Sequence, residues 1–179
     1  MLVHDKAMLA VVDFQDKLLH LIDGHEEILP RALKLIAFAQ ALKMPILWSE
    51  QYKKGLGESN EAVRSALEGV PAHEKLSFGC MGDEGCRAFI EQTGHPQLLI
   101  TGIEAHICVL QTALAAVEDG YEVFVVQDAI GSQDPANHEV ACARMRQNGV
   151  QLVTTQMAMF ELLREAGTPA FKAALPLLK

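Results

Sequence analysis

The sequence predicts an α/β protein with three layers: a six-stranded, mainly parallel sheet with helices on both faces, in a Rossmann-like arrangement. Three observations lead to this fold class. Short runs rich in Val, Ile and Leu alternate with longer segments of helical spacing along the whole chain. The first run, Ala7–Val12, is apolar throughout, which is typical of a strand covered on both faces. Glycine or proline follows most of the helical segments.

The expected strands are short apolar runs bounded by turn residues or by helical segments. A polar, glycine-rich loop over residues 53–58 follows the second run, and the third run is short. In chain order the six strands are Ala7–Val12, Pro45–Ser49, Ala72–Lys75, Gln97–Thr101, Glu122–Gln127 and Gln151–Thr154. Because helical segments separate them, right-handed crossovers would make the sheet mainly parallel.

Helices are predicted where apolar residues recur at helical spacing. Asn60 and Thr155 are the expected N-caps of two helices. Gly94, Gly120 and Gly149 follow three others and mark their ends. The six predicted helices are Glu26–Leu42, Asn60–Leu67, Asp83–Gln92, a helix that runs from Cys108 to Asp119, Asn137–Asn148 and Met157–Arg164. With no internal repeat or linker, residues 1–179 are expected to form a single domain.

Composition and charge exclude several classes of partner. The formal net charge of −8 disfavours nucleic acid, because phosphate binding needs a basic surface. The first residues lack the basic and apolar regions of a signal peptide, and no apolar stretch is long enough to span a bilayer. The four cysteines have no C-x-x-C spacing, which indicates free thiols in a reducing cytosol. The sequence therefore predicts a cytoplasmic protein that binds neither nucleic acid nor membrane.

In open parallel sheets, functional sites gather beyond the carboxyl ends of the strands. This rule selects Asp13, the Ser49–Tyr52 turn, Lys75, the Gly102–Cys108 turn and Asp128 as candidate site positions. An acid, a cation and a thiol that converge on this edge would make an activated nucleophile.

The positions of the thiol and the acid suit that chemistry. A thiol in the first turn of a helix lies near unpaired N–H groups and the positive end of the dipole, so Cys108 is expected to favour the thiolate. Asp13 directly follows a buried strand, where partial desolvation suits a carboxylate to accept a proton. For Cys108 alone, the alternative is a structural cysteine packed as a small hydrophobe. Cys80 and Cys86 are not spaced like metal-binding pairs and are expected to be spectator thiols.

The chain resembles the isochorismatase-like cysteine hydrolases over nearly its whole length. The landmarks of that family are an Asp after the first strand, a Lys after the third and a Gly-aliphatic-x-Ala-x-x-Cys turn. They match Asp13, Lys75 and the turn Gly102–Cys108. The segments Ser49–Gly57, Gly102–Thr112 and Gly120–Val123 are most similar to the isochorismatase domain-containing branch.

The resemblance implies a mechanism without a cofactor. Asp13 would take the thiol proton, and Lys75 would maintain the charge pattern that favours the Cys108 thiolate. The thiolate would attack the carbonyl carbon of a small-molecule substrate, expel an amine or ammonia, and leave a thioester that water hydrolyses. A non-proline cis peptide at Ile103–Glu104 would let the N–H groups of Glu104 and Cys108 form the oxyanion hole. The resemblance also implies a homo-oligomer.

Departures from the family narrow the substrate. Isochorismatases proper generally lack the nucleophilic cysteine, so Cys108 argues against isochorismate. Nicotinamidases of the family carry an Asp-x-His metal site after the second strand, where this chain has Ser49-Glu50-Gln51-Tyr52, so no metal is expected. The expected substrate is a small amide or related C–N compound. The candidates for residues that line the pocket are Gln15, Gln51, Tyr52, Phe78 and His106.

Two other functions stay open at this point. A thiol redox protein could use Cys108 as its reactive thiol, with a second cysteine nearby to resolve it. A non-catalytic scaffold could keep the hydrolase fold, in which case Cys108 would not be unusually reactive. The rate at which Cys108 is alkylated separates these functions.

Overall fold

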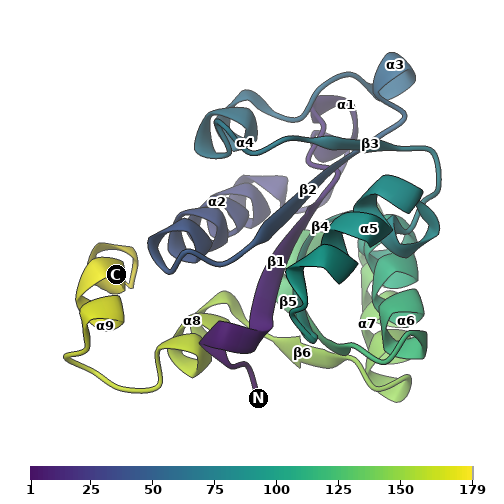
Figure 1. Cartoon of the computed structure of the whole chain (residues 1–179). Coiled ribbons are helices and arrows are strands. Elements are labelled where there is room, and N and C mark those ends of the chain that lie inside the picture. The colour runs from purple at the N-terminus through teal and green to yellow at the C-terminus, as the bar shows by residue number, and fades with distance from the viewer. Residues whose placement is uncertain (179) are drawn as a thin grey trace.

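The computed structural model describes residues 1–178, and its centre is one sheet of six parallel strands between two layers of helices (Figure 1). The strand order is β3-β2-β1-β4-β5-β6, so the chain starts in the middle of the sheet and builds outward on both sides. The strands are β1 (Ala7–Val12), β2 (Ile46–Gln51), β3 (His73–Lys75), β4 (Gln97–Ile103), β5 (Glu122–Gly131) and β6 (Gln151–Val153). The predicted three-layer α/β class is confirmed.

Each face of the sheet has its own hydrophobic core, because side chains alternate along a strand. On β1, Leu9 and Val11 join one core, whereas Met8, Ala10 and Val12 join the other. The first core lies under α2 (His25–Ala41), α4 (Glu61–Ala66), α8 (Thr155–Leu163) and α9 (Pro169–Ala174). The second core lies under α5 (Glu84–Thr93), α6 (Leu110–Glu118) and α7 (Pro135–Gln147), on the opposite face in Figure 1. Double coverage explains the unbroken apolar run of β1.

The structure extends or corrects several predicted elements. β4 and β5 run beyond their predicted ends, and their pairing register shifts between Ile100 and Gly102. The predicted loop after β2 instead contains a short helix, α3 (Lys53–Leu56), and another, α1 (Asp16–Leu19), follows β1. The predicted cap Thr155 is wrong: the hydroxyl of Thr154 accepts the hydrogen bond from the backbone N–H of Met157 and caps α8.

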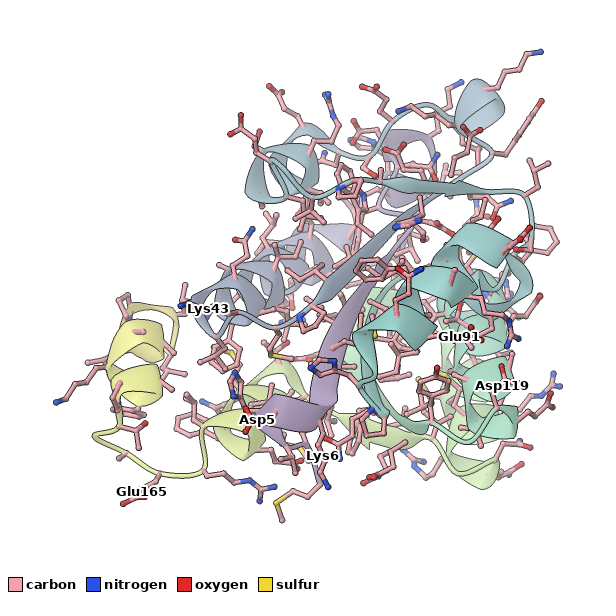
Figure 2. All side chains as sticks on the ribbon, viewed as in Figure 1. Asp5, Lys6, Lys43, Glu91, Asp119 and Glu165 are labelled. Atoms are coloured by element: carbon pink, nitrogen blue, oxygen red, sulfur yellow. The ribbon has the colours of Figure 1, made fainter. Side chains whose placement is uncertain are left out.

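The register of the parallel strands brings their carboxyl ends to one edge. Val12 is paired with Ser49 on one side and with Gly102 on the other, and Lys75 is paired with Gln51. In Figure 1 this edge lies near α1 and α3. Of the residues labelled in Figure 2, Asp5 and Lys6 precede β1 and Lys43 precedes β2, at the opposite end of the sheet. Among residues 1–178, no helix combines the length and apolar character needed to cross a bilayer.

Candidate active site

Asp13 occupies the first position after β1, where the backbone turns sharply. Its φ is 54°, its N–H donates to Ser49 O at 3.1 Å, and its side chain is fully buried. The Ser49 hydroxyl donates to Asp13 Oδ1 at 2.8 Å, and Lys75 Nζ donates to Asp13 Oδ2 at 2.7 Å. Both carboxylate oxygens therefore have a fixed donor, as a buried carboxylate requires.

Lys75 ends β3, and its ammonium group is held by oxygen atoms. Nζ donates to Asp13 Oδ2, to Gln51 Oε1 at 2.8 Å and to Phe78 O at 2.8 Å, with Ser77 O at 3.3 Å. An ammonium has three N–H donors, so these partners occupy all of them. Lys75 can therefore act on a neighbouring thiol through its charge rather than as a hydrogen-bond donor.

The charge on Lys75 is stable because of its neighbours. Burial by itself lowers the pKa of Lys75, but the carboxylate of Asp13 and the thiols of Cys108 and Cys80 outweigh it and hold the pKa above its ordinary value. The side chains of Lys75 and Asp13 are both 0% exposed. A buried cation of this kind persists only with a close partner of opposite charge.

Cys108 lies in a wide helical turn, Ala105–Val109, that joins β4 to α6. The N–H of Val109 donates to Glu104 O at 3.2 Å, a bond from residue i+5 to residue i, so this turn is wider than an α-helical turn. The peptide bond between Ile103 and Glu104 is cis, as the resemblance implies. The predicted α-helix through Cys108 starts at Leu110 instead, and the wide turn gives Cys108 a different direction from that of a regular helix.

Cys108 is 5% exposed, and its thiol lies near enough to Asp13 and Lys75 for both charges to act on its pKa. Burial raises the pKa of Cys108, the carboxylate and hydrogen bond of Asp13 raise it further, and only the Lys75 ammonium acts against them. The raised pKa runs against the expectation that a position at a helix start favours the thiolate, because burial and Asp13 outweigh the Lys75 ammonium. It favours the thiol form of Cys108, beside a carboxylate that is chemically able to accept a proton.

Gly102 permits the close approach of β4 to β1 at this point. Its φ is 150°, and a Cβ atom there would lie 2.4 Å from Val12 O and 2.5 Å from Val12 Cβ. Real Cβ contacts are not this short, so any side chain would displace Val12 and the adjoining Asp13. Gly102 thus permits the short distance between β1, which Asp13 follows, and β4, which leads into the turn with Cys108.

The amides of Gln15 and Gln51 are engaged within the protein. Gln15 pairs with the backbone of Gln51, accepting from its N–H at 2.7 Å and donating to its carbonyl at 2.9 Å. Gln51 accepts from Lys75 and donates to Leu76 O at 2.9 Å. Gln51 therefore orients the ammonium of Lys75, and Gln15 fixes the strand end that carries Gln51.

The other pocket candidates differ in exposure. Tyr52 and Phe78 are 47% and 53% exposed, so their rings are free to contact a substrate. His106 Nδ1 lies 2.9 Å from the Ser132 hydroxyl, and the Glu104 carboxylate accepts from the N–H of Gln133 at 3.1 Å. The side chains of His106 and Glu104 thus contact the segment after β5. A role for the N–H groups of Glu104 and Cys108 as an oxyanion hole stays a prediction.

Asp128, which was also selected as a candidate because of its place near the carboxyl end of a strand, belongs to a separate cluster. Its carboxylate accepts from the N–H of Thr155 at 2.7 Å and from the Thr155 hydroxyl at 3.0 Å, and lies 3.8 Å from Arg31. It therefore joins β5 to α8 and α2 rather than to the cysteine cluster. Among residues 1–178, no three or more His, Cys, Asp or Glu side chains are grouped so that they could hold a metal ion.

Three residues around the cluster have side-chain contacts that the sequence did not predict, although the Ser49–Tyr52 turn was selected as a candidate site position. Ser49 donates to Asp13, and Cys80 Sγ lies 3.7 Å from the Ser49 hydroxyl. The Cys80 N–H donates to Thr112 Oγ1 at 2.9 Å, and Thr112 Oγ1 donates to Cys108 O at 2.7 Å. Cys80 is thus linked to the candidate site through Ser49 and Thr112. The only sequence signal was the place of Ser49 at a strand end, since single buried hydroxyls have no periodic pattern.

The parallel sheet, with a buried acid, cation and thiol at its carboxyl edge, defines a class of three-layer α/β proteins that place a cysteine after the fourth strand. A model of the isochorismatase domain matches residues 7–157. The chain belongs to the isochorismatase family.

Relatives match the chain over almost its whole length. Isochorismatase family protein 1B of Dictyostelium discoideum is 32% identical, with 99% of this chain and 88% of the relative covered. Isochorismatase domain-containing protein 2 of Danio rerio is 34% identical, with 96% of this chain and 86% of the relative covered.

Solved structures share the fold. The structure described as MAR1 ribonuclease from Caenorhabditis elegans has a TM-score of 0.93 at 31% identity and covers 99% of this chain and 91% of its own. The YcaC gene product of Escherichia coli, described as an octameric hydrolase of unknown specificity, has a TM-score of 0.92 at 28% identity, with 99% and 88% covered. Membership of the isochorismatase family indicates a hydrolase.

Proposed function

We propose that this protein is a cysteine-dependent hydrolase of a small amide or related C–N bond that acts through a thioester on Cys108. The observation that carries the proposal is the position of the buried Cys108 beside the buried Asp13–Lys75 ion pair, where both charges act on the pKa of the thiol. A carboxylate beside a thiol can take its proton, and a fixed cation stabilises the thiolate that forms.

The proposed first step is attack on the carbonyl carbon. Asp13 accepts the proton of Cys108, the sulfur forms a bond to the carbonyl carbon, and the carbonyl oxygen becomes an oxyanion near the N–H groups of Glu104 and Cys108. The C–N bond then breaks, and the proton held by Asp13 leaves with the amine or ammonia. The product of this stage is a thioester on Cys108.

Water completes the cycle in the second step. Asp13, again a carboxylate, takes a proton from water as the oxygen attacks the thioester carbon. The bond to sulfur breaks, the acid product leaves, and the proton returns to the Cys108 sulfur. Lys75 stays charged in both steps, because its three donors remain on Asp13, Gln51 and Phe78 O.

A relative supports covalent chemistry on an amide. YcaC from Pseudomonas aeruginosa, which is 27% identical with a TM-score of 0.91, is described with hexane-2,5-diol and covalent acrylamide. Acrylamide is a small amide that is also an electrophile. For this chain we propose that small electrophilic amides modify Cys108, and that the assembly is a homo-oligomer, as in the octameric relative.

RNA is not proposed as a substrate, although one relative is described as a ribonuclease. The net charge of −8 gives this chain no excess of cations to hold phosphates. A cytoplasmic location stays a prediction, because one relative is named a secreted effector of Phytophthora sojae. We expect purified protein to leave single-stranded RNA intact under conditions in which it hydrolyses an amide.

The test is ammonia release from a panel of small amides, carbamoyl compounds and ureido acids. Cys108→Ala should abolish release from any active compound and should fail to form the acyl adduct that mass spectrometry detects on the Cys108 peptide. Cys142→Ala is the matched control, since Cys142 is also a buried thiol but lies on α7 with Arg146 as its charged neighbour. Turnover retained by Cys108→Ala would overturn the proposal.

A further inference from the structure

The loop from Ser77 to Cys80 contacts both the ammonium of Lys75 and the helix that follows Cys108. Its carbonyl groups at Ser77 and Phe78 hold the ammonium of Lys75, at 3.3 and 2.8 Å. Its end, Cys80, is fully buried and contacts residues of two other elements. The position of this loop therefore affects where the charge of Lys75 lies relative to Cys108.

Thr112 fixes the end of the loop to the helix that follows Cys108. Its Oγ1 accepts from the N–H of Cys80 at 2.9 Å and donates to Cys108 O at 2.7 Å. One hydroxyl thus connects the loop directly to the nucleophile residue. The hydroxyl is fully buried, so no water competes for either bond.

The backbone packing supports this attachment. A Cβ atom at Gly79 would lie 3.1 Å from Gln111 C and 3.1 Å from Thr112 N, so the loop lies directly against α6. On its other side, the Cys80 thiol lies 3.7 Å from the Ser49 hydroxyl, which donates to Asp13. The loop is therefore attached at one end to both α6, the helix that follows Cys108, and β2, the strand that carries Ser49.

We infer that Thr112 is a positioning residue. Its hydroxyl fixes the Ser77–Cys80 loop, whose carbonyl groups hold the Lys75 ammonium, at one place relative to Cys108. The inference rests on the proposed function, in which the charge of Lys75 stabilises the thiolate. Thr112 does not contact the substrate and acts through the loop. A misplacement of about 1 Å at an active site can lower the rate by about 100-fold.

Alkylation of Cys108 by iodoacetamide measures this effect without a known substrate. When the Cys108 proton moves to Asp13, a thiolate forms but the protein as a whole neither gains nor loses a proton. Alkylation through this thiolate therefore has a rate that does not depend on pH. At higher pH, loss of the proton to hydroxide adds a rate that rises with pH. The charged and titratable groups that face Cys108 are Asp13, Lys75 and Cys80.

The decisive variant is Thr112→Val, which keeps the shape of the side chain and removes the hydroxyl. We expect the pH-independent rate of Cys108 alkylation to fall by roughly 10- to 100-fold, with the rising limb still present. Thr112→Ser keeps the hydroxyl and should restore most of the rate. The rate is followed by mass spectrometry of the Cys108 peptide at a temperature at which every variant is folded.

Thr101→Val is the matched control, because it also removes a buried threonine hydroxyl that donates to a carbonyl, that of Ala129 at 2.6 Å. It should leave the pH-independent rate unchanged. An equal fall in Thr101→Val, or a normal rate in folded Thr112→Val, overturns the positioning role while the hydrolase proposal stands. If the wild-type protein shows no pH-independent rate, the proposed activation of Cys108 fails instead.

Discussion

The ion pair at the candidate site and an ion pair on the surface of α2 have nearly equal lengths but different surroundings. Lys75 and Asp13 are 2.7 Å apart, and both side chains are 0% exposed. Arg31 and Glu27 are 2.8 Å apart, with side chains 40% and 72% exposed. The distance alone therefore does not show how much either pair contributes to stability.

Solvent decides the difference between the two pairs. The surface pair lies one helical turn apart, and water and salt screen it, so its net contribution is small. The buried pair lost its hydration on folding, and each charge depends on the other and on fixed hydrogen bonds. Stability alone therefore does not account for the buried pair, because apolar residues of the same volume would stabilise the fold as well.

Removal of one buried charge should have the largest effect on stability. Lys75→Met leaves the Asp13 carboxylate with no cation in a dry site, and the free energy of unfolding should fall by about 3–5 kcal/mol. Urea unfolding, followed by circular dichroism, measures the change.

The double variant Asp13→Asn/Lys75→Met is the control for that experiment. It removes both charges, so it should recover part of the stability that Lys75→Met loses. A double variant no more stable than the single one would show that packing of the lysine chain, and not the unpaired charge, causes the loss.

The alkaline pH dependence of stability should reveal the same buried environment. The pKa of Cys108 is raised in the folded protein above the ordinary value of 9.0. Between pH 9.0 and the higher pKa of the folded protein, the unfolded chain has lost a proton that the folded chain keeps, so the free energy of unfolding falls as pH rises. From pH 8 to pH 10, Cys108 should contribute a loss of about 1.4 kcal/mol, which Cys108→Ser should lack.

Lys75 adds to the alkaline loss at higher pH. The pKa of Lys75 in the folded protein is also raised above the ordinary value of 10.5. Its contribution to the free energy of unfolding is therefore fully present below pH 10.5 and is lost as the pH rises through the folded pKa. Urea unfolding of wild type and Cys108→Ser at a series of pH values separates the two groups: the loss that begins near pH 9 should be smaller in the variant, and the loss above pH 10.5 should remain but change, because Cys108 also raises the pKa of Lys75. A wild-type stability that is flat to pH 10 would contradict a raised Cys108 pKa.

Much of the fold was predictable because burial leaves a pattern in the sequence. The unbroken apolar run Ala7–Val12 reports a strand covered on both faces, and Gly94, Gly120 and Gly149 mark the ends of helices. The parallel order then places the ends of the strands together, which is why Asp13 and Lys75 could be selected before their contact was known.

The rest of the site depends on three-dimensional detail that no pattern carries. The hydroxyls of Ser49 and Thr112 are single polar groups among apolar neighbours, and their partners lie far away in sequence. The raised pKa of Cys108 follows mainly from burial, and the position of a residue at the start of a helix does not show how deeply it is buried. Thr154 and Thr155 are adjacent threonines, and only the direction of each side chain shows that the first caps α8.

The smallest expected effect belongs to the surface pair. Glu27→Gln removes its charge, keeps the shape of the side chain, and should lower the free energy of unfolding by less than about 0.5 kcal/mol. In about 1 M NaCl even this difference should vanish, because the Debye length falls to about 3 Å. The loss caused by Lys75→Met should stay the same in that salt, since ions do not reach a dry pair. If the two losses respond equally to salt, then water reaches Asp13 and Lys75 in solution, and their charges are screened in the same way as those on α2.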